Sequence, residues 1–121
     1  ASYTSPQMLQ FDQITKIDLY CTYNTDRFLA LTSRLPNLTE LYVSETDATD
    51  AGVVAAAECK QLIGFSITSW GNLLTMNSIN NLSNIKTLRQ INLEISSQPN
   101  DLSKLRDALP ECKIYEITYG N

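Results

Sequence analysis

The chain has 121 residues, of which 43% are apolar and 18% are charged, and its formal net charge is −4. This length and apolar share suffice for one globular domain with its own core. The acidic balance, with a pI near 4.6, argues against a general binder of nucleic acid, which needs clustered lysine and arginine. No stretch reaches the ~20 apolar residues of a membrane span, so we expect neither nucleic acid nor a membrane as a partner.

The three cysteines are Cys21, Cys59 and Cys112, and they cannot all pair within the chain. Their spacings of 38 and 53 residues match no metal-binding motif. Free buried thiols are typical of a reducing compartment. The first residues also lack the apolar core of a signal peptide, so these features favour a cytoplasmic location over secretion.

Residues 1–10 precede the first regular pattern and are expected to form an irregular N-terminal cap or linker. From Phe11 onward, apolar residues recur in four columns whose steps are 24, 24, 26 and 24 residues. The first two columns are Phe11, Leu35, Cys59, Ile85, Leu109 and Ile14, Leu38, Leu62, Leu88, Cys112. The other two are Ile17, Leu41, Phe65, Ile91, Tyr115 and Leu19, Val43, Ile67, Leu93, Ile117. A period in this range with L-x-x-L-x-L units is typical of leucine-rich repeat solenoids.

Each unit is expected to contribute a short strand and then a helix. Alternating apolar and polar residues predict strands at 16–20, 40–44, 64–68, 90–94 and 114–118. Strands one unit apart run in the same direction, so the sheet is expected to be parallel.

Helical spacing of apolar residues follows three of these strands. The stripes are Phe28, Leu31, Leu35, then Met76, Ile79, Leu82, and finally Leu102, Leu105, Leu109. Helix starts are predicted at Thr49 or Asp50 and at Asn100 or Asp101. Pro36 and Pro110 are predicted to end the helices that precede them.

Residues 49–62 resemble the cysteine-containing leucine-rich repeats, whose units read I-T-D-x-G-L-x-x-L-A-x-x-C-x-x-L. The matching positions are Thr49, Asp50, Gly52, Val53, Cys59 and Leu62. Residues 109–114 also resemble the closing repeat of such arrays. The family includes the repeat arrays of F-box substrate receptors and many bacterial proteins. The resemblance implies an α/β solenoid over residues 1–121, of four to five repeats, with a short parallel sheet on the concave face and helices on the convex face.

Catalytic chemistry finds little support in the sequence. There is no histidine, and the four glycines are too far apart for a phosphate-binding loop. Glu45, Asp47 and Asp50 lie close together, but acids in such loops are expected to cap helices rather than to hold a metal or transfer protons. We therefore expect no enzyme, no catalytic or metal-binding residues and no cofactor.

The residues between the apolar columns are predicted to project from the strands and to form a binding surface. They carry acids and aromatic rings and a single lysine (Lys16). The small residues of the middle unit, Gly64, Ser66 and Thr68, are expected to leave a shallow dip between the flanking side chains. Trp70 follows the third strand and either widens that turn or projects as an anchor. The residues expected to bind a partner are Asp18, Tyr20, Glu40, Tyr42, Ser66, Thr68, Trp70, Asn92 and Glu94.

These features favour a non-catalytic module that binds a protein partner through the concave strand face, and a basic partner would suit its acids. One alternative is a small acidic inhibitor or immunity-type protein that blocks a basic enzyme. Another is an adaptor or substrate-receptor fragment of a larger assembly. The ends of the array lack evident caps, which makes them a candidate route for self-association.

Overall fold

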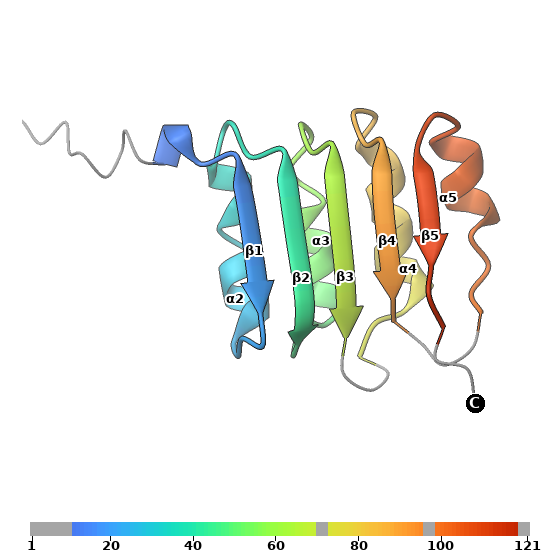
Figure 1. Ribbon diagram of the computed structural model, residues 1–121, viewed down its shortest axis with the longest axis horizontal. Coiled ribbons are helices and arrows are strands. Elements are labelled where there is room, and N and C mark those ends of the chain that lie inside the picture. The colour runs from blue at the N-terminus through green and yellow to red at the C-terminus, as the bar shows by residue number, and fades with distance from the viewer. Residues whose placement is uncertain (1–10, 70–72, 96–98, 119–121) are drawn as a thin grey trace, which may run out of the picture.

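The computed structural model describes residues 11–69, 73–95 and 99–118. It is a mixed α/β structure in which five parallel strands form one sheet in the order β1-β2-β3-β4-β5 (Figure 1). The strands are β1 (Lys16–Tyr20), β2 (Glu40–Thr46), β3 (Gly64–Ser69), β4 (Gln90–Glu94) and β5 (Lys113–Glu116).

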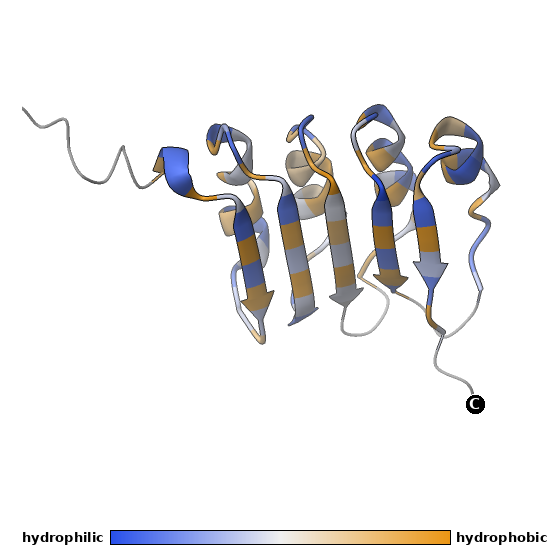
Figure 2. Cartoon of the chain, turned by 45° about the horizontal axis from the view of Figure 1, so that its top comes forward, coloured by the Kyte–Doolittle hydropathy of each residue, from blue (hydrophilic) through white to orange (hydrophobic). Residues whose placement is uncertain are grey.

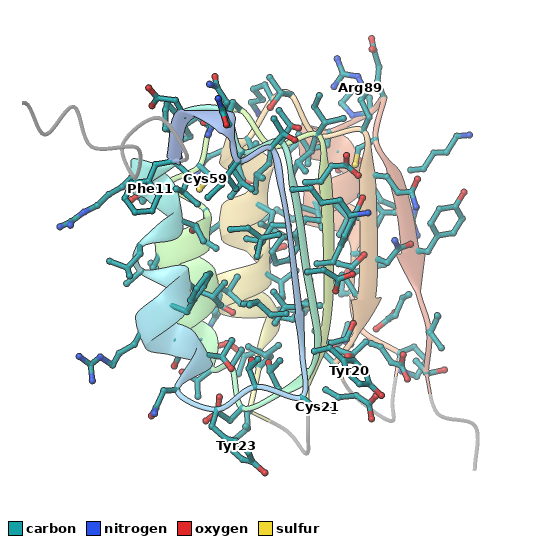
Figure 3. The ribbon with its side chains drawn as sticks, turned by 60° about the vertical axis from the view of Figure 1, so that its left-hand side comes forward. Phe11, Tyr20, Cys21, Tyr23, Cys59 and Arg89 are labelled. Carbon is teal, nitrogen blue, oxygen red and sulfur yellow. The ribbon has the colours of Figure 1, made fainter. Side chains whose placement is uncertain are left out.

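Helices lie between the strands along the chain. They are α2 (Thr25–Leu29), α3 (Asp50–Ala56), α4 (Met76–Ile79) and α5 (Ser103–Ala108), with 3-10 turns η1 (Thr32–Arg34) and η2 (Asn80–Asn84). All of them cover the same face of the sheet, which Figure 3 shows from the side. In the part of the chain that the structure describes, the opposite face carries no helix, and we call it the open face.

The alternation in the strands explains this arrangement. Leu41 and Val43 are fully buried against the helices, whereas Tyr42 between them is only half-buried on the open face. Figure 2 shows the same alternation as bands of colour along the strands. Strands β1 and β4 have the predicted bounds, while β2 and β3 start as predicted and run slightly further. The predicted parallel pairing is confirmed, because Ile17 pairs with Leu41, Leu41 with Phe65 and Phe65 with Ile91.

The predicted register of the last strand is wrong. Ile91 pairs with Ile114 rather than with Tyr115, and Asn92 pairs with Tyr115. Tyr115 and Ile117, which the columns assigned to the core, are 50% and 56% exposed, whereas Ile114 is 5% exposed. A shift of one residue moves every side chain to the other face. The observed register buries an isoleucine and leaves the Tyr115 hydroxyl in water, where it needs no buried partner.

The predicted apolar stripe of the first helix is also wrong in part. Phe28 and Leu31 are 43% and 51% exposed, while Leu29 and Thr32 are fully buried. The helix α2 ends at Leu29 and gives way to the 3-10 turn η1. Residues three apart share a face in such a turn, so Leu29 and Thr32 lie in line with Leu35 on the buried face. The other two stripes are confirmed as packed, since Ile79, Leu82, Leu102, Leu105 and Leu109 are buried and Met76 is partly buried.

Aspartates on α2 and α3 each join their helix to the start of the helix in the next unit. Asp26 accepts hydrogen bonds from the backbone nitrogen of Thr49 at 2.8 Å and from its hydroxyl. Asp50 does the same for Thr75, at 2.8 Å from the nitrogen and 2.7 Å from the hydroxyl. Thr49 and Thr75 are the N-cap residues of α3 and α4. The predicted capping role of the loop acids is therefore confirmed for Asp50, which caps the helix of the next unit. It is confirmed for Asp47 as well, which accepts bonds from the backbone nitrogens of Asn24 and Thr25 at the start of α2, both at 3.0 Å.

The start of α5 differs from its prediction. The helix begins at Ser103 rather than directly after Asn100 or Asp101, and Asp101 accepts bonds from the backbone nitrogen and hydroxyl of Ser103 at 3.0 and 2.7 Å. The predicted endings hold, because Leu35 and Leu109 are the C-cap residues before Pro36 and Pro110.

The three cysteines are free thiols, with Cys59 buried, Cys112 half-buried and Cys21 exposed. Burial raises the pKa of the Cys59 thiol and of the Cys112 thiol. Among the described residues, no helix is long and apolar enough to cross a membrane.

Candidate functional site

The open face consists of rows of side chains that the strand register aligns. The row nearest the amino ends of the strands is Lys16, Glu40, Gly64, Gln90 and Lys113. The central row is Asp18, Tyr42, Ser66, Asn92 and Tyr115. At the carboxyl ends Tyr20 pairs with Ser44 and Thr68 pairs with Glu94. These rows contain every residue predicted for the binding surface except Trp70, which lies outside the described residues.

A hollow of about 490 Å³ opens near the amino ends of the strands, and we call it the amino-end hollow. Gly64 forms part of its lining, which includes Glu40, Tyr42, Arg89, Asn92 and Lys113. A Cβ atom at Gly64 would lie 3.2 Å from the Tyr42 hydroxyl, so a larger residue there would crowd this ring. The amino-end hollow thus includes Gly64 of the predicted dip, whereas Ser66 and Thr68 are not part of its lining.

Two cations at this hollow were missed from the sequence. Lys113 belongs to the first row only because the register of β5 is one residue from the predicted one. Arg89 directly precedes β4, and its backbone nitrogen bonds the Ile63 carbonyl at 2.8 Å, continuing a backbone ladder from Thr39. The 26-residue step from Ile63 to Arg89 was a signal that could have located it. The open face therefore has a basic side as well as acids.

Arg89 is held loosely at the rim of the amino-end hollow. One guanidinium nitrogen donates to the carbonyls of Lys86 and Leu88 at 3.0 and 2.9 Å. The other lies 3.8 Å from a Glu111 carboxylate oxygen, and both side chains are more than half exposed. An exposed ion pair at this distance contributes little stability, so Glu111 does not fix the position of the guanidinium.

Tyr42 lies in the central row of the open face, on β2, and its hydroxyl donates to the Glu40 carboxylate. This hydrogen bond, together with partial burial and the nearby charges of Glu40 and Asp18, raises the pKa of Tyr42 to about 12. The Lys16 ammonium lies 5.4 Å from the centre of the ring, within cation–π range. The ring is thus held in one orientation by a contact at its hydroxyl and a contact over its face.

A second hollow, of about 410 Å³, lies at the carboxyl ends of the strands and is lined by Tyr20, Ser44, Glu45, Thr68 and Glu94. We call it the carboxyl-end hollow. Glu45 has a left-handed backbone (φ 51°) at an irregularity in the pairing of β2 with β3, and its nitrogen bonds the Thr68 hydroxyl at 2.7 Å. Hydrogen bonding with Glu45 raises the pKa of Tyr20. Figure 3 shows Tyr20 and Arg89 at opposite ends of the sheet.

The side chains between the hollows are polar and partly matched to one another. The Asn92 amide donates to the Ser66 hydroxyl at 3.0 Å, and both side chains are half-buried. Within the described ranges no three histidine, cysteine, aspartate or glutamate residues form a group that could hold a metal ion. The arrangement offers hydrogen bonds, aromatic surface and charge of both signs, which are the means of non-covalent recognition.

Searches of family models, of curated proteins and of solved structures for proteins similar to this chain each found no match.

Proposed function

We propose that the chain is a non-catalytic protein-interaction module whose binding surface is the open face. The single observation that carries this proposal is an all-parallel sheet on which the described helices all cover one face. Parallel sheets usually have both faces covered, and here the second face presents polar and aromatic side chains over two hollows. A protein partner is the natural cover for a surface of this kind.

The aromatic residues of the open face support the same proposal. Tyr20 is 64% exposed and Tyr115 is 50% exposed, while Tyr42 lies between them in a fixed orientation. Tyrosine supplies a large contact area at a small cost in side-chain entropy and is enriched at interface hot spots. Tyr42 is thus the proposed centre of the interface.

The charge pattern defines the partner more closely than the acidic composition does. The two bases Arg89 and Lys113 line the amino-end hollow beside Glu40 and Glu111, whereas the charged residues that line the carboxyl-end hollow are the acids Glu45 and Glu94. With a rise of ~3.3 Å per residue, the five-residue span of a strand separates the two groups by ~13 Å. The partner that this surface suits carries an acidic group and a basic group at about this separation, rather than basic residues alone.

The unit structure supports a leucine-rich repeat solenoid as the architecture of this module. The backbone ladder from Thr15 through Thr39 and Ile63 to Arg89 repeats the same bond at steps of 24, 24 and 26 residues. Each step encloses one strand and one helical segment. Arrays of this type bind through strand faces that are extended and rigid. The sequence left two alternatives, an inhibitor of a basic enzyme and an adaptor fragment of a larger assembly. The mixed charge of the open face suits the adaptor better than the inhibitor.

Photo-crosslinking tests this proposal directly. A benzoylphenylalanine at Ser66, in the middle of the open face, should capture one discrete protein from an extract of the cells that make the chain. Unlabelled wild-type chain should compete for this capture, and the Tyr42→Ala variant should compete poorly. The same probe at Lys104 on α5 is the matched control and should capture nothing above background. Equal capture at Ser66 and Lys104, or full competition by Tyr42→Ala, would move the interface away from the open face.

A further inference from the structure

The flank of the first unit, beside β1 and α2, is an exposed apolar surface. A hollow of about 490 Å³ lies there, and its apolar lining comes from Phe11, Ile14, Ile17, Phe28, Leu31 and Leu35. We call it the flank hollow. Figure 3 looks onto this flank, with Phe11 beside the first helix. One unit further along, the counterparts of Ile14 and Ile17 are Leu38 and Leu41, and both are fully buried.

The strand at this flank also has one unpaired edge. β1 pairs with β2 and with no other strand in the described part of the chain. Its backbone bonds to β2 begin at the Thr15 carbonyl and end at the Cys21 nitrogen, at 2.9 and 3.1 Å. In a parallel pair these bonds come from alternate residues. The backbone groups of Lys16, Asp18 and Tyr20 therefore point outward from the edge, ready to pair with another strand.

We propose that this flank binds a second copy of the chain, with β1 of one copy antiparallel to β1 of the other. A twofold axis perpendicular to the sheet then passes between the two Ile17 residues. The two sheets become continuous, and the helices of both copies lie on the same side. The Phe28 and Leu31 side chains of one copy meet those of the other and fill the two flank hollows, which removes their exposed apolar surface from water.

Charge complementarity selects the register of this pairing. With Ile17 opposite Ile17, Lys16 of each copy lies opposite Asp18 of the other. The backbone groups of both residues point outward from the sheet edge, so the two residues form a hydrogen-bonded pair. Opposite charges directly across an antiparallel pair stabilise it. The neighbouring registers that keep the hydrogen bonds would place Asp18 against Asp18 or Lys16 against Lys16, which destabilises them. The sequence of this edge is thus complementary to itself in one register.

Sedimentation velocity of the full 121-residue chain tests this proposal without any other partner. The weight-average mass should rise with concentration toward twice the mass of one chain and should not continue beyond it, because a twofold contact closes on itself. A single-chain mass at every concentration up to the solubility limit would overturn the proposal. Growth to larger, open-ended species would overturn it as well.

Charge-reversal variants test the register. Asp18→Lys alone and Lys16→Asp alone each place like charges opposite one another twice per dimer. Each should weaken the dimer by about tenfold or more. The double variant Lys16→Asp/Asp18→Lys restores both pairs and should return the dissociation constant to within about threefold of wild type. A double variant as weak as the single ones would overturn the pairing.

An apolar variant tests the helix side of the contact. Leu31→Glu places a charge in the flank hollow and should abolish the dimer. Val54→Glu is the matched control, because Val54 is 46% exposed on α3 and lies outside the flank hollow. Circular dichroism should show that both variants remain folded, since neither side chain is buried. A dimer that persists in Leu31→Glu, or that is lost equally in Val54→Glu, would contradict the contact.

Discussion

The Asp26 carboxylate accepts a hydrogen bond from the backbone nitrogen of Thr49 at 2.8 Å, so a residue of one unit caps the helix of the next. The first turn of that helix must approach the carboxylate closely, and Gly52 permits this. A Cβ atom at Gly52 would lie 2.1 Å from the nearer Asp26 carboxylate oxygen. The glycine of the T-D-x-G signature is therefore explained by a contact between units rather than by its own backbone conformation.

Gly52→Ala should destabilise the chain by displacing the Asp26 carboxylate from the cap. The loss of a capping interaction costs about 0.5–2 kcal/mol, and urea denaturation monitored by circular dichroism measures it. Asp26→Ala should cost a similar amount for the same reason. In the double variant the two effects should be clearly less than additive, because both remove the same contact. Full additivity would show that Gly52→Ala acts through something other than Asp26.

Stability should fall in acid because several carboxylates are charged hydrogen-bond acceptors. The Thr25 hydroxyl and backbone lower the pKa of Asp47, and Ser103 lowers that of Asp101. Partial burial pushes the pKa of Asp50 upward, but hydrogen bonds from Ser78 and Thr75 outweigh it and the net pKa is lowered. A lowered folded pKa contributes stability above the unfolded value of ~3.9, and this contribution is lost as the pH falls through the folded pKa.

Urea denaturation between pH ~6 and ~2 should therefore show the free energy of unfolding falling mainly below pH ~4. Asp50→Asn keeps an acceptor oxygen but removes the charge, so it should reduce the slope in this range. A variant with the same slope as wild type would show that Asp50 does not contribute to the acid sensitivity.

The Tyr42 hydroxyl should titrate at a higher pH than the hydroxyl of an ordinary tyrosine. Its pKa is raised to about 12, first by the hydrogen bond to Glu40, so the neutral ring is favoured in the folded state. The corresponding stability is present below the unfolded pKa of ~10 and is lost as the pH rises from there toward about 12. Carbon-13 NMR of the Tyr42 ring measures this titration. Glu40→Gln should lower the pKa toward the ordinary value, and an unchanged value would rule out Glu40 as the main cause.

Leu41→Ala should cost ~2–5 kcal/mol, because it removes a fully buried side chain from the centre of the core. Ile17→Ala is the matched control, since Ile17 occupies the same column on the edge strand and is only partly buried. It should cost clearly less, and thermal denaturation compares the two. Equal losses would mean that the first unit is covered as completely as the second.

The apolar columns predicted the five strands and their parallel pairing, because a fixed repeat length carries the register from one unit to the next. The prediction failed at β5, where one residue fewer lies between Cys112 and Ile114 than between Leu88 and Ile91. It also failed at Phe28 and Leu31, because a helical stripe was expected where a 3-10 turn changes the spacing. Both failures lie in the units of β1 and β5, which in the described sheet each pair with a single strand.

The candidate site could also be predicted in part, because the strand pattern shows which side chains share a face. Strand alternation alone places Glu40, Tyr42 and Asn92 on the open face. Lys113 required the observed register of β5, and Arg89 lies outside the strand pattern altogether. The two hollows depend on side-chain packing and on the irregular backbone at Glu45, which no repeat pattern encodes.

The most direct measurement of the central proposal is calorimetric binding of the protein captured at Ser66 to matched variants of this chain. Tyr42→Ala should weaken binding by more than about fivefold, and Lys113→Glu and Glu94→Lys should each weaken it most at low salt. Lys104→Glu on α5 should leave the affinity unchanged. If the open-face variants bind as tightly as wild type while Lys104→Glu does not, the partner binds the helical face, and the proposed function of the open face is wrong.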